Sequence, residues 1–362
     1  MTNRVTNRQI IFILILTLSS YSIVDISRAM AASAGYGSWL TILVTAIFFT
    51  VIAIINLSLG NKFKGQMLFD YSKHLVGKFG SYTVTIYYII YFSIIIVFLS
   101  LQLSIMLKAN FLPKTPKAAT LIVGIPVFCF IAYKGITTLA RLFELIGIFY
   151  IIIGVSVQVL MVTQGKLENI LPFFNIADIG EYIGAIKEAI FPFLGIEVLL
   201  VIPLTKENGK KATITAAVTV FVIGLLYIFF VESTIMKLGM NNIVHYNSSL
   251  IVAIRDMELP FLDFMKRADV LFLTFGFAAF FLGITMVYTA ITEYLCKMFT
   301  HAKRYYIVII IGILSYAACL IFDNDPAFNK FVTGVGIYLG LVASAVLPTI
   351  LLIIAKVKKN VL

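Results

Sequence analysis

Long apolar runs, separated by short polar segments, set the organisation of this chain. Most runs are close to the ~20 residues that a helix needs to cross the hydrocarbon core of a membrane. We therefore predict ten transmembrane helices, and an even number places both termini on the same side. The predicted helices are Ile10–Ala32, Trp39–Leu59, Tyr82–Leu107, Ala118–Tyr133, Leu142–Val162, Ala185–Leu204, Ala212–Ile235, Ala268–Tyr294, Tyr305–Phe322 and Phe331–Ala355.

The first run has a second interpretation. Arg4 and Arg8, followed by apolar residues and the small-residue run Ala29–Ala34, are also typical of a secretory signal peptide. Apolar sequence resumes immediately, and many more runs follow. We therefore interpret the first run as an uncleaved transmembrane helix.

The sixth run, Ala185–Leu204, departs from a simple spanning helix. Pro192, Gly195 and Pro203 interrupt it, and Glu197 places a carboxylate near its middle. A charged side chain at mid-membrane costs roughly 2.5–3.5 kcal/mol on insertion scales, so it normally faces protein or water. Interrupted helices with polar groups at this depth are typical of secondary-transporter binding sites. A kinked helix whose Glu197 bonds a neighbouring helix is the alternative, and the sequence leaves both open.

The first run carries an unusual set of polar residues. Ser19, Ser20 and Ser22 lie near its midpoint, where serine hydroxyls can bond a carbonyl or a ligand. Asp25 and Arg28 are three residues apart and therefore share one helix face. As a ligand pair they would suit the ammonium and carboxylate of an amino acid. A local ion pair, with Arg28 extending toward the interface, is the alternative interpretation.

Composition and charge support membrane insertion. The chain has 362 residues, of which 61% are hydrophobic and 12% charged, against about 25% charged residues in soluble domains. The net charge of +11 is concentrated in short loops between apolar runs, and no basic-aromatic motif for nucleic acid appears. More Lys and Arg residues fall in the termini and the loops on their side than on the opposite side. The charge rule therefore predicts that both termini are cytoplasmic.

Catalytic and metal-binding motifs are not found. The sequence has no phosphate-binding loop, serine-hydrolase motif or zinc-protease motif. Its cysteines lie in or beside apolar runs without metal-ligand spacing: Cys129, Cys296 and Cys319. We expect no enzymatic activity, no catalytic or metal-ligating residues, and no cofactor.

The ten predicted helices divide into two halves of five. The first helix of each half carries acidic residues at depth, and corresponding unusual segments in two halves point to an inverted repeat. We predict one transmembrane domain, residues 1–362, with repeats at about 9–163 and 185–355 and an outer loop at 236–267. Within that loop, Ile243–Leu262 fits either a short interfacial helix over the outer mouth or a partly ordered loop.

Several stretches together resemble the B-subunit family of bacterial spore germinant receptors, which is related to the amino acid/polyamine/cation permeases. Their order and spacing along the chain carry the resemblance. The stretches are Ala34–Trp39 (AGYGSW), Leu112–Pro116 (LPKTP), Tyr133–Arg141 (YKGITTLAR), Leu171–Pro172, Phe191–Leu200 (FPFLGIEVLL) and Lys266–Thr274 (KRADVLFLT).

The resemblance implies an all-α polytopic fold, a 5+5 inverted repeat with discontinuous helices 1 and 6. It implies a place in the spore inner membrane with an A-type receptor subunit, a C-type lipoprotein subunit and membrane lipid. The germinant would be a small molecule, often an amino acid, bound at mid-membrane between helices 1 and 6. The implied ligand-binding residues are Ser19, Ser20, Tyr21, Ser22, Asp25, Arg28, Phe191, Phe193, Gly195 and Glu197.

Three functions fit this pattern. A sensor would bind the germinant and signal to its partner subunits, which requires unequal ligand affinity for two states. An active transporter would move an amino acid or a cation and use Asp25 or Glu197 as a proton or ion site. A structural subunit would keep a pocket without using it. The first two need the same cavity, so we favour the sensor on the resemblance alone.

Overall fold

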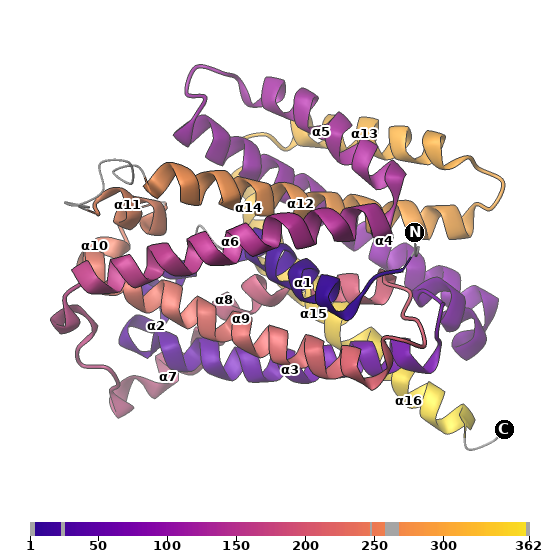
Figure 1. The fold of residues 1–362 in the computed structure, drawn as a ribbon, viewed down its shortest axis with the longest axis horizontal. Helices are drawn as coiled ribbons and strands as arrows, with labels where there is room; N and C mark the ends of the chain where they lie inside the picture. The colour runs from indigo at the N-terminus through magenta and orange to yellow at the C-terminus, as the bar shows by residue number, and fades with distance from the viewer. Residues whose placement is uncertain (1–3, 23–25, 247, 258–267, 360–362) are drawn as a thin grey trace.

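The computed structural model describes residues 4–22, 26–246, 248–257 and 268–359, and within these ranges all regular structure is helical. Most helices run along one direction and surround α1 (Figure 1). The α-helices are α1 (Asn7–Ser22), α2 (Ile26–Ala34), α3 (Ser38–Lys62), α4 (Leu68–Asn110), α5 (Lys117–Lys134), α6 (Ile136–Gln164), α7 (Ile179–Gly184), α8 (Ile186–Ile190), α9 (Gly209–Leu238), α10 (Met240–Ile243), α11 (Ser249–Arg255), α12 (Ala268–Met298), α13 (Arg304–Ile321), α14 (Pro326–Phe331), α15 (Ile337–Leu341) and α16 (Leu347–Lys359).

The predicted spans agree with these elements. Eight helical stretches of the described chain are long and apolar enough to cross a membrane, and together they contain or overlap eight of the predicted spans besides the first and the sixth. The first predicted span contains α1 and α2, and residues 23–25 between them lie outside the described ranges. The sixth predicted span is divided into shorter pieces. The sixth consists of α8 and two 3₁₀ segments, Phe191–Phe193 and Ile196–Val201.

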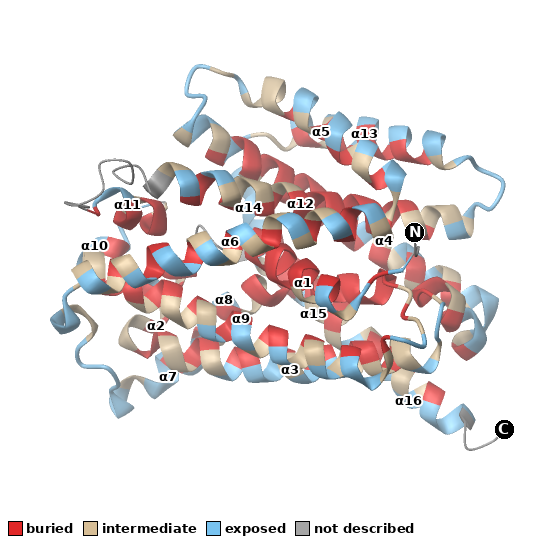
Figure 2. Cartoon of the chain, in the orientation of Figure 1, coloured by how far each residue is buried: buried red, intermediate tan, exposed pale blue. Residues whose placement is uncertain are grey.

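Helix α1 lies at the centre of the bundle. It packs against α6, α9 and α12, and its residues are buried along almost its whole length (Figure 2). Its sequence is apolar on every side between Ile10 and Leu18, as expected for a helix enclosed by others rather than one with a single buried stripe. Ser19 and Ser20, which follow, are therefore placed inside the protein rather than against lipid.

Both ends of the chain lie at the same end of the molecule (Figure 1). Arg4 forms an ion pair with Glu207 at 2.8 Å, and the Lys358 ammonium donates to the Leu75 carbonyl oxygen at 2.7 Å. We call this the inner end, following the charge rule, and the opposite end, which carries α10 and α11, the outer end. The structure thus agrees with an even number of crossings, while the orientation in the membrane stays a prediction.

The long outer loop is only partly the interfacial helix considered above. It contains α11, whose Leu250, Ile251 and Ile254 are buried. Because α11 packs against α9 and α12, its apolar face covers the bundle instead of lying in lipid. Residues 258–262 of the predicted segment fall outside the described ranges.

The last predicted span contains two π-helical turns, Val332–Gly336 and Val342–Val346. A π turn leaves carbonyl groups without their usual helical partners. Two hydroxyls from α4 bond carbonyls within this span: Tyr87 donates to Leu339 at 2.7 Å and Tyr88 donates to Ala343 at 2.5 Å. The second π turn and the helix α15 before it are therefore stabilised from a neighbouring helix.

Candidate functional site

The interruption of the sixth span is centred on Leu194 and Gly195. Leu194 is extended, with φ −66° and ψ 154°, and Gly195 has a φ of 102°, in the left-handed region that favours glycine. The Gly195 N–H donates to a carboxyl oxygen of Glu197 at 2.9 Å. Glu197 thus bonds the backbone two residues before it, and this contact holds the turn that breaks the helix.

The interruption packs directly on α1 and on α15. A Cβ atom at Gly195 would lie 2.9 Å from the Tyr21 ring and 3.2 Å from the Thr17 methyl group. Leu194 fills the space beside Gly340, where a Cβ atom would approach Leu194 within 2.6 Å. Gly195 and Gly340 therefore allow three chain segments to meet at the break.

Aromatic rings form a layer at this level. The Phe191 ring lies 5.8 Å from the Tyr21 ring and 5.5 Å from the Phe98 ring, measured between centroids. The Pro192 carbonyl, which cannot bond within a regular helix here, accepts a hydrogen bond from the Tyr227 hydroxyl at 3.1 Å. This layer separates the space toward the outer end from the residues beneath it.

A cavity of about 450 Å³ lies on the outer side of the aromatic layer. We call it the outer cavity. Its volume is within the ~300–1,000 Å³ usual for small-molecule sites. The lining residues are Ser20, Tyr21, Ile26, Arg28, Ala29, Phe98, Leu99, Gln102, Ile105, Met106, Glu188, Phe191, Pro192, Ser248, Phe280, Thr333 and Ile337.

The residues proposed from sequence fall into separate groups. The outer cavity brings four of them together: Ser20, Tyr21, Arg28 and Phe191. Phe193, Gly195 and Glu197 are buried beneath the aromatic layer and do not line the cavity. The side chains of Ser22 and Asp25 lie outside the described residues.

Ser19 points elsewhere. It lines a small void on the far side of α1, together with Tyr150 of α6 and Tyr227 of α9. Ser20 instead packs so closely on α12 that a Cβ atom at Gly283 would collide with it. Adjacent residues on a helix point about 100° apart, so the packing of α1 on α12 selects Ser20 for the cavity and turns Ser19 away.

The structure adds polar residues that the sequence analysis did not select. Glu188 of α8 and Gln102 of α4 line the outer cavity, as do Ser248 and Thr333. Glu188 is exposed, and among the described residues its side chain has no ion pair or hydrogen bond. The sequence could have indicated Glu188 as a candidate site residue. It precedes Phe191 by three residues and therefore shares a helix face with it.

The cavity therefore presents opposite charges. Glu188 supplies a carboxylate, and Arg28 of α2 supplies a guanidinium that already interacts with another group of the protein. The Gln102 amide and the hydroxyls of Ser20 and Thr333 also line the cavity, where they can form hydrogen bonds with a ligand. Such a set can hold a small molecule that carries both an ammonium and a carboxylate group.

A second polar group lies beneath the aromatic layer. Glu197 is fully buried, and its second carboxyl oxygen has no hydrogen-bond partner in the described protein. The hydroxyls of Tyr21 and Tyr91 are also buried without such a partner, and Tyr91 faces Glu197. Buried polar atoms are usually satisfied, by ordered water where no protein group reaches them. This cluster lies beneath the outer cavity and meets it at Tyr21, which lines that cavity as well.

Comparisons with known proteins agree with this architecture. Residues 4–327 match a family model described as "Spore germination protein". The chain is 19% identical to spore germination protein YndE of Bacillus subtilis (strain 168) over 362 residues, covering 99% of this chain and 98% of that protein. It is 22% identical to spore germination protein B2 of the same organism over 213 residues, or 58% of each chain.

Solved structures with a similar fold are transporters. A Na⁺-coupled sialic acid symporter in its substrate-bound outward-open state matches with a TM-score of 0.67 at 13% identity, over 95% of this chain and 79% of that one. MhsT in complex with L-phenylalanine matches with a TM-score of 0.66 at 14% identity, over 97% and 89%. These likenesses confirm the transporter-like, all-α polytopic fold, while the predicted repeat boundaries stay a prediction. The relatives are germination proteins and transporters rather than enzymes.

Proposed function

Because this chain belongs to the B-subunit family of spore germinant receptors, we propose that it is a germinant-sensing membrane subunit that binds a small ligand in the outer cavity. The single observation that carries the proposal is the presence of Glu188 and Arg28 in one cavity, directly above the interruption of the sixth span. Ligand bound there would touch α2 of the first predicted span and α8 of the divided sixth span at once.

The chemistry of the cavity favours an amino acid. Glu188 would accept hydrogen bonds from the ligand ammonium, and Arg28 would donate to its carboxylate. The aromatic layer of Tyr21, Phe98 and Phe191 would contact the ligand side chain. MhsT, which has a similar fold, was solved in complex with L-phenylalanine. That complex supports an amino acid as the ligand class.

Signalling would follow from unequal affinity for two arrangements of the first and sixth predicted spans. A ligand shifts such an equilibrium only if it binds one state more tightly. A contact to α8 is suited to this, because a short helix beside the interruption at Leu194 and Gly195 can move without unfolding a full span. We propose an A-type subunit and a C-type lipoprotein as the partners that receive the change, in the spore inner membrane with both termini in the cytoplasm.

The test exchanges each charged residue for its neutral counterpart. Glu188→Gln and Arg28→Gln should each raise the amino-acid concentration that gives a half-maximal germination response. A hydrogen bond to a charged group contributes about 1.5–3 kcal/mol, which corresponds to roughly a 10- to 150-fold change. The measurement is the dose response of spores to the most effective member of a panel of L-amino acids, with the subunit quantified by immunoblot.

Lys187→Gln is the matched control, because Lys187 is exposed next to Glu188 but does not line the cavity. Its dose response should equal that of the unmodified protein. An unchanged response in both cavity variants, at normal subunit levels, would contradict the proposal.

Active transport of an amino acid or cation is the second candidate function. The symporter fold of the structural neighbours favours it, together with the buried carboxyl group of Glu197 beneath the cavity. Uptake of a labelled L-amino acid into proteoliposomes that contain this chain alone would support transport. Binding of that amino acid without uptake would support the sensor.

A further inference from the structure

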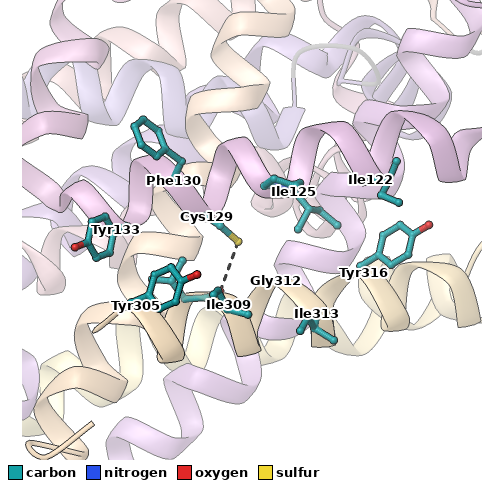
Figure 3. A pocket seen from close by; sticks show the side chains of 12 residues that line it. Ile122, Ile125, Cys129, Phe130, Tyr133, Tyr305, Ile309, Gly312, Ile313 and Tyr316 are labelled. Atoms are coloured by element: carbon teal, nitrogen blue, oxygen red, sulfur yellow. Dashed lines mark hydrogen bonds between the residues drawn. The ribbon is translucent and has the colours of Figure 1, made fainter. Parts of the chain in front are cut away.

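An apolar groove lies between α5 and α13 and shares no lining residue with the outer cavity. The two helices lie next to each other at the edge of the bundle (Figure 1). Its volume is about 680 Å³. Figure 3 shows the two helices side by side, with Ile122 and Tyr316 toward one end of the groove and Tyr133 and Tyr305 toward the other. The residues that line it are Ile122, Ile125, Pro126, Cys129, Phe130, Tyr133, Tyr305, Val308, Ile309, Gly312, Ile313 and Tyr316.

The floor of the groove is formed by a close helix contact. A Cβ atom at Gly312 would lie 2.7 Å from the Cys129 sulfur, and the Cys129 thiol donates to the Val308 carbonyl at 3.5 Å (Figure 3). Larger side chains stand on either side of this contact and face outward, with Phe130 60% and Ile313 64% exposed. In a membrane protein these exposed apolar walls face lipid.

The inner end of the groove is positively charged. Lys134 and Lys303 are exposed there, and neither forms an ion pair within the described chain. The Lys134 ammonium lies over the Phe130 ring at 5.3 Å, beside the groove wall. Arg304 is different, because it is bound to Glu293 and to the Ala132 carbonyl, each at 2.7 Å.

At the outer end of the groove, basic and acidic residues balance. Lys117, at the start of α5, is paired with Asp323 at 2.7 Å and also donates to Asn324. Lys114 is exposed in the loop before α5, and Asp325 supplies a second carboxylate after α13. Two tyrosines, Tyr133 and Tyr305, mark the inner end with ring centroids 6.5 Å apart, and tyrosine is enriched at membrane interfaces. The groove thus has an apolar length, an interfacial pair of rings and a cationic mouth at one end only.

We propose that this groove is a binding site for an anionic phospholipid. The acyl chain lies along the groove between α5 and α13, and the headgroup phosphate is held by Lys134 and Lys303. Basic residues at one end of a crevice between transmembrane helices suit an anionic headgroup. This charge distinguishes a lipid from a transmembrane helix of a second copy, because the carboxylates that the described chain carries at the inner end are already paired within the chain: Asp70, Glu144, Glu207 and Glu293.

The test measures lipid retention directly. The purified full-length protein is reconstituted in nanodiscs that contain phosphatidylglycerol and phosphatidylcholine in equal amounts, and retained lipid is counted by native mass spectrometry after release. The unmodified protein should retain phosphatidylglycerol in preference to phosphatidylcholine. The Lys134→Gln/Lys303→Gln double variant should lower that preference by roughly 10- to 30-fold, since each interfacial lysine contributes modestly. The control is the Lys73→Gln/Lys78→Gln double variant, which removes two exposed inner-end lysines outside the groove. This control should leave the preference for phosphatidylglycerol unchanged.

A second pair of variants tests the groove itself. Ile313→Trp fills the groove and should lower retention of both lipids, whereas Ile310→Trp, on an exposed face of α13 outside the groove, should not. Equal retention of the two lipids by the unmodified protein would overturn the proposal. It would also be overturned if the lysine pair or Ile313→Trp had no effect, or if cross-linking showed that a second copy covers the groove. Germinant response is not part of this measurement, so it stands apart from the proposed sensor function.

Discussion

At Gly195 both the backbone conformation and the packing require a residue without a side chain. The residue has a φ of 102°, and its open side faces Tyr21 and Thr17 of α1. An L-residue pays a conformational cost at this φ, and a side chain there would also overlap the Tyr21 ring. The break therefore depends on one glycine for its shape and for its contact with the first span.

We expect Gly195→Ala to destabilise the protein by about 1–3 kcal/mol, because strain and overlap add at this position. Thermal unfolding of the purified protein in detergent measures the change. Gly184→Ala is the control, since a Cβ atom at Gly184 would meet no neighbouring group within 4 Å and the residue ends the exposed helix α7. Equal melting temperatures for the two variants would contradict the assignment of strain to the break.

Glu197 acts on the same turn through one hydrogen bond. Its carboxyl oxygen accepts from the Gly195 N–H at 2.9 Å while the whole side chain is buried. Glu197→Gln keeps an acceptor of similar shape, so the fold should be retained. Glu197→Leu leaves the N–H without a partner and should cost about 1–3 kcal/mol. The melting temperatures of the two purified variants test this, and a Leu variant as stable as the Gln variant would argue against it.

At the scale of elements, irregular segments are supported by neighbouring helices. The sixth span is divided between α8 and two 3₁₀ segments, and α1 and α15 pack against its break. The last span includes two π turns, and the Ala343 carbonyl of the second turn and the Leu339 carbonyl of α15 accept tyrosine hydroxyls from α4. The interruption of the sixth span and the second π turn thus each have a specific contact from another element.

Tyr88→Phe removes one such contact. The Ala343 carbonyl would stay buried without its donor, so we expect a loss of about 1–3 kcal/mol in stability. The exposed Tyr338 on α15 provides the comparison, because Tyr338→Phe removes a hydroxyl for which no hydrogen bond is found in the described chain. Thermal unfolding should separate the two, and coincident curves would show that the π turn does not need Tyr88.

At the scale of the whole molecule, the positions of the outer cavity and the aromatic layer indicate from which end of the protein a ligand reaches the site. The cavity lies toward the end that carries α11, and Phe193 and Glu197 lie beneath the layer, fully buried. A polar reagent applied from that end should reach the cavity but not the residues below. We therefore expect the site to be reached from the outer end.

Cysteine labelling tests this access. In a background with Cys129, Cys296 and Cys319 replaced by Ala, Gln102→Cys should react with a membrane-impermeant maleimide added outside, and Phe193→Cys should not. Labelling is read by gel shift on intact vesicles of known orientation. Fast reaction of the Phe193→Cys variant, or reaction of Gln102→Cys only from the inside, would contradict the described access.

The sequence by itself determined the spans and the place of the interruption. Hydrophobic length is a local property of each run, and Pro192 and Gly195 break a helix wherever it packs. The position of Glu197 in the divided span followed in the same way. These features depend on neighbours along the chain, which is why the apolar runs were sufficient to predict a polytopic helical protein, whereas the transporter-like fold was predicted from the family resemblance.

Only the tertiary structure decided which polar residues share a cavity. The rotation of α1 against Gly283 turns Ser20 toward the cavity and Ser19 toward α6. Glu197 folds back to its own backbone, so the carboxylate of the cavity is that of Glu188 instead. Depth and direction of a side chain are set by the helices that pack around it, and no pattern along a single run contains that information.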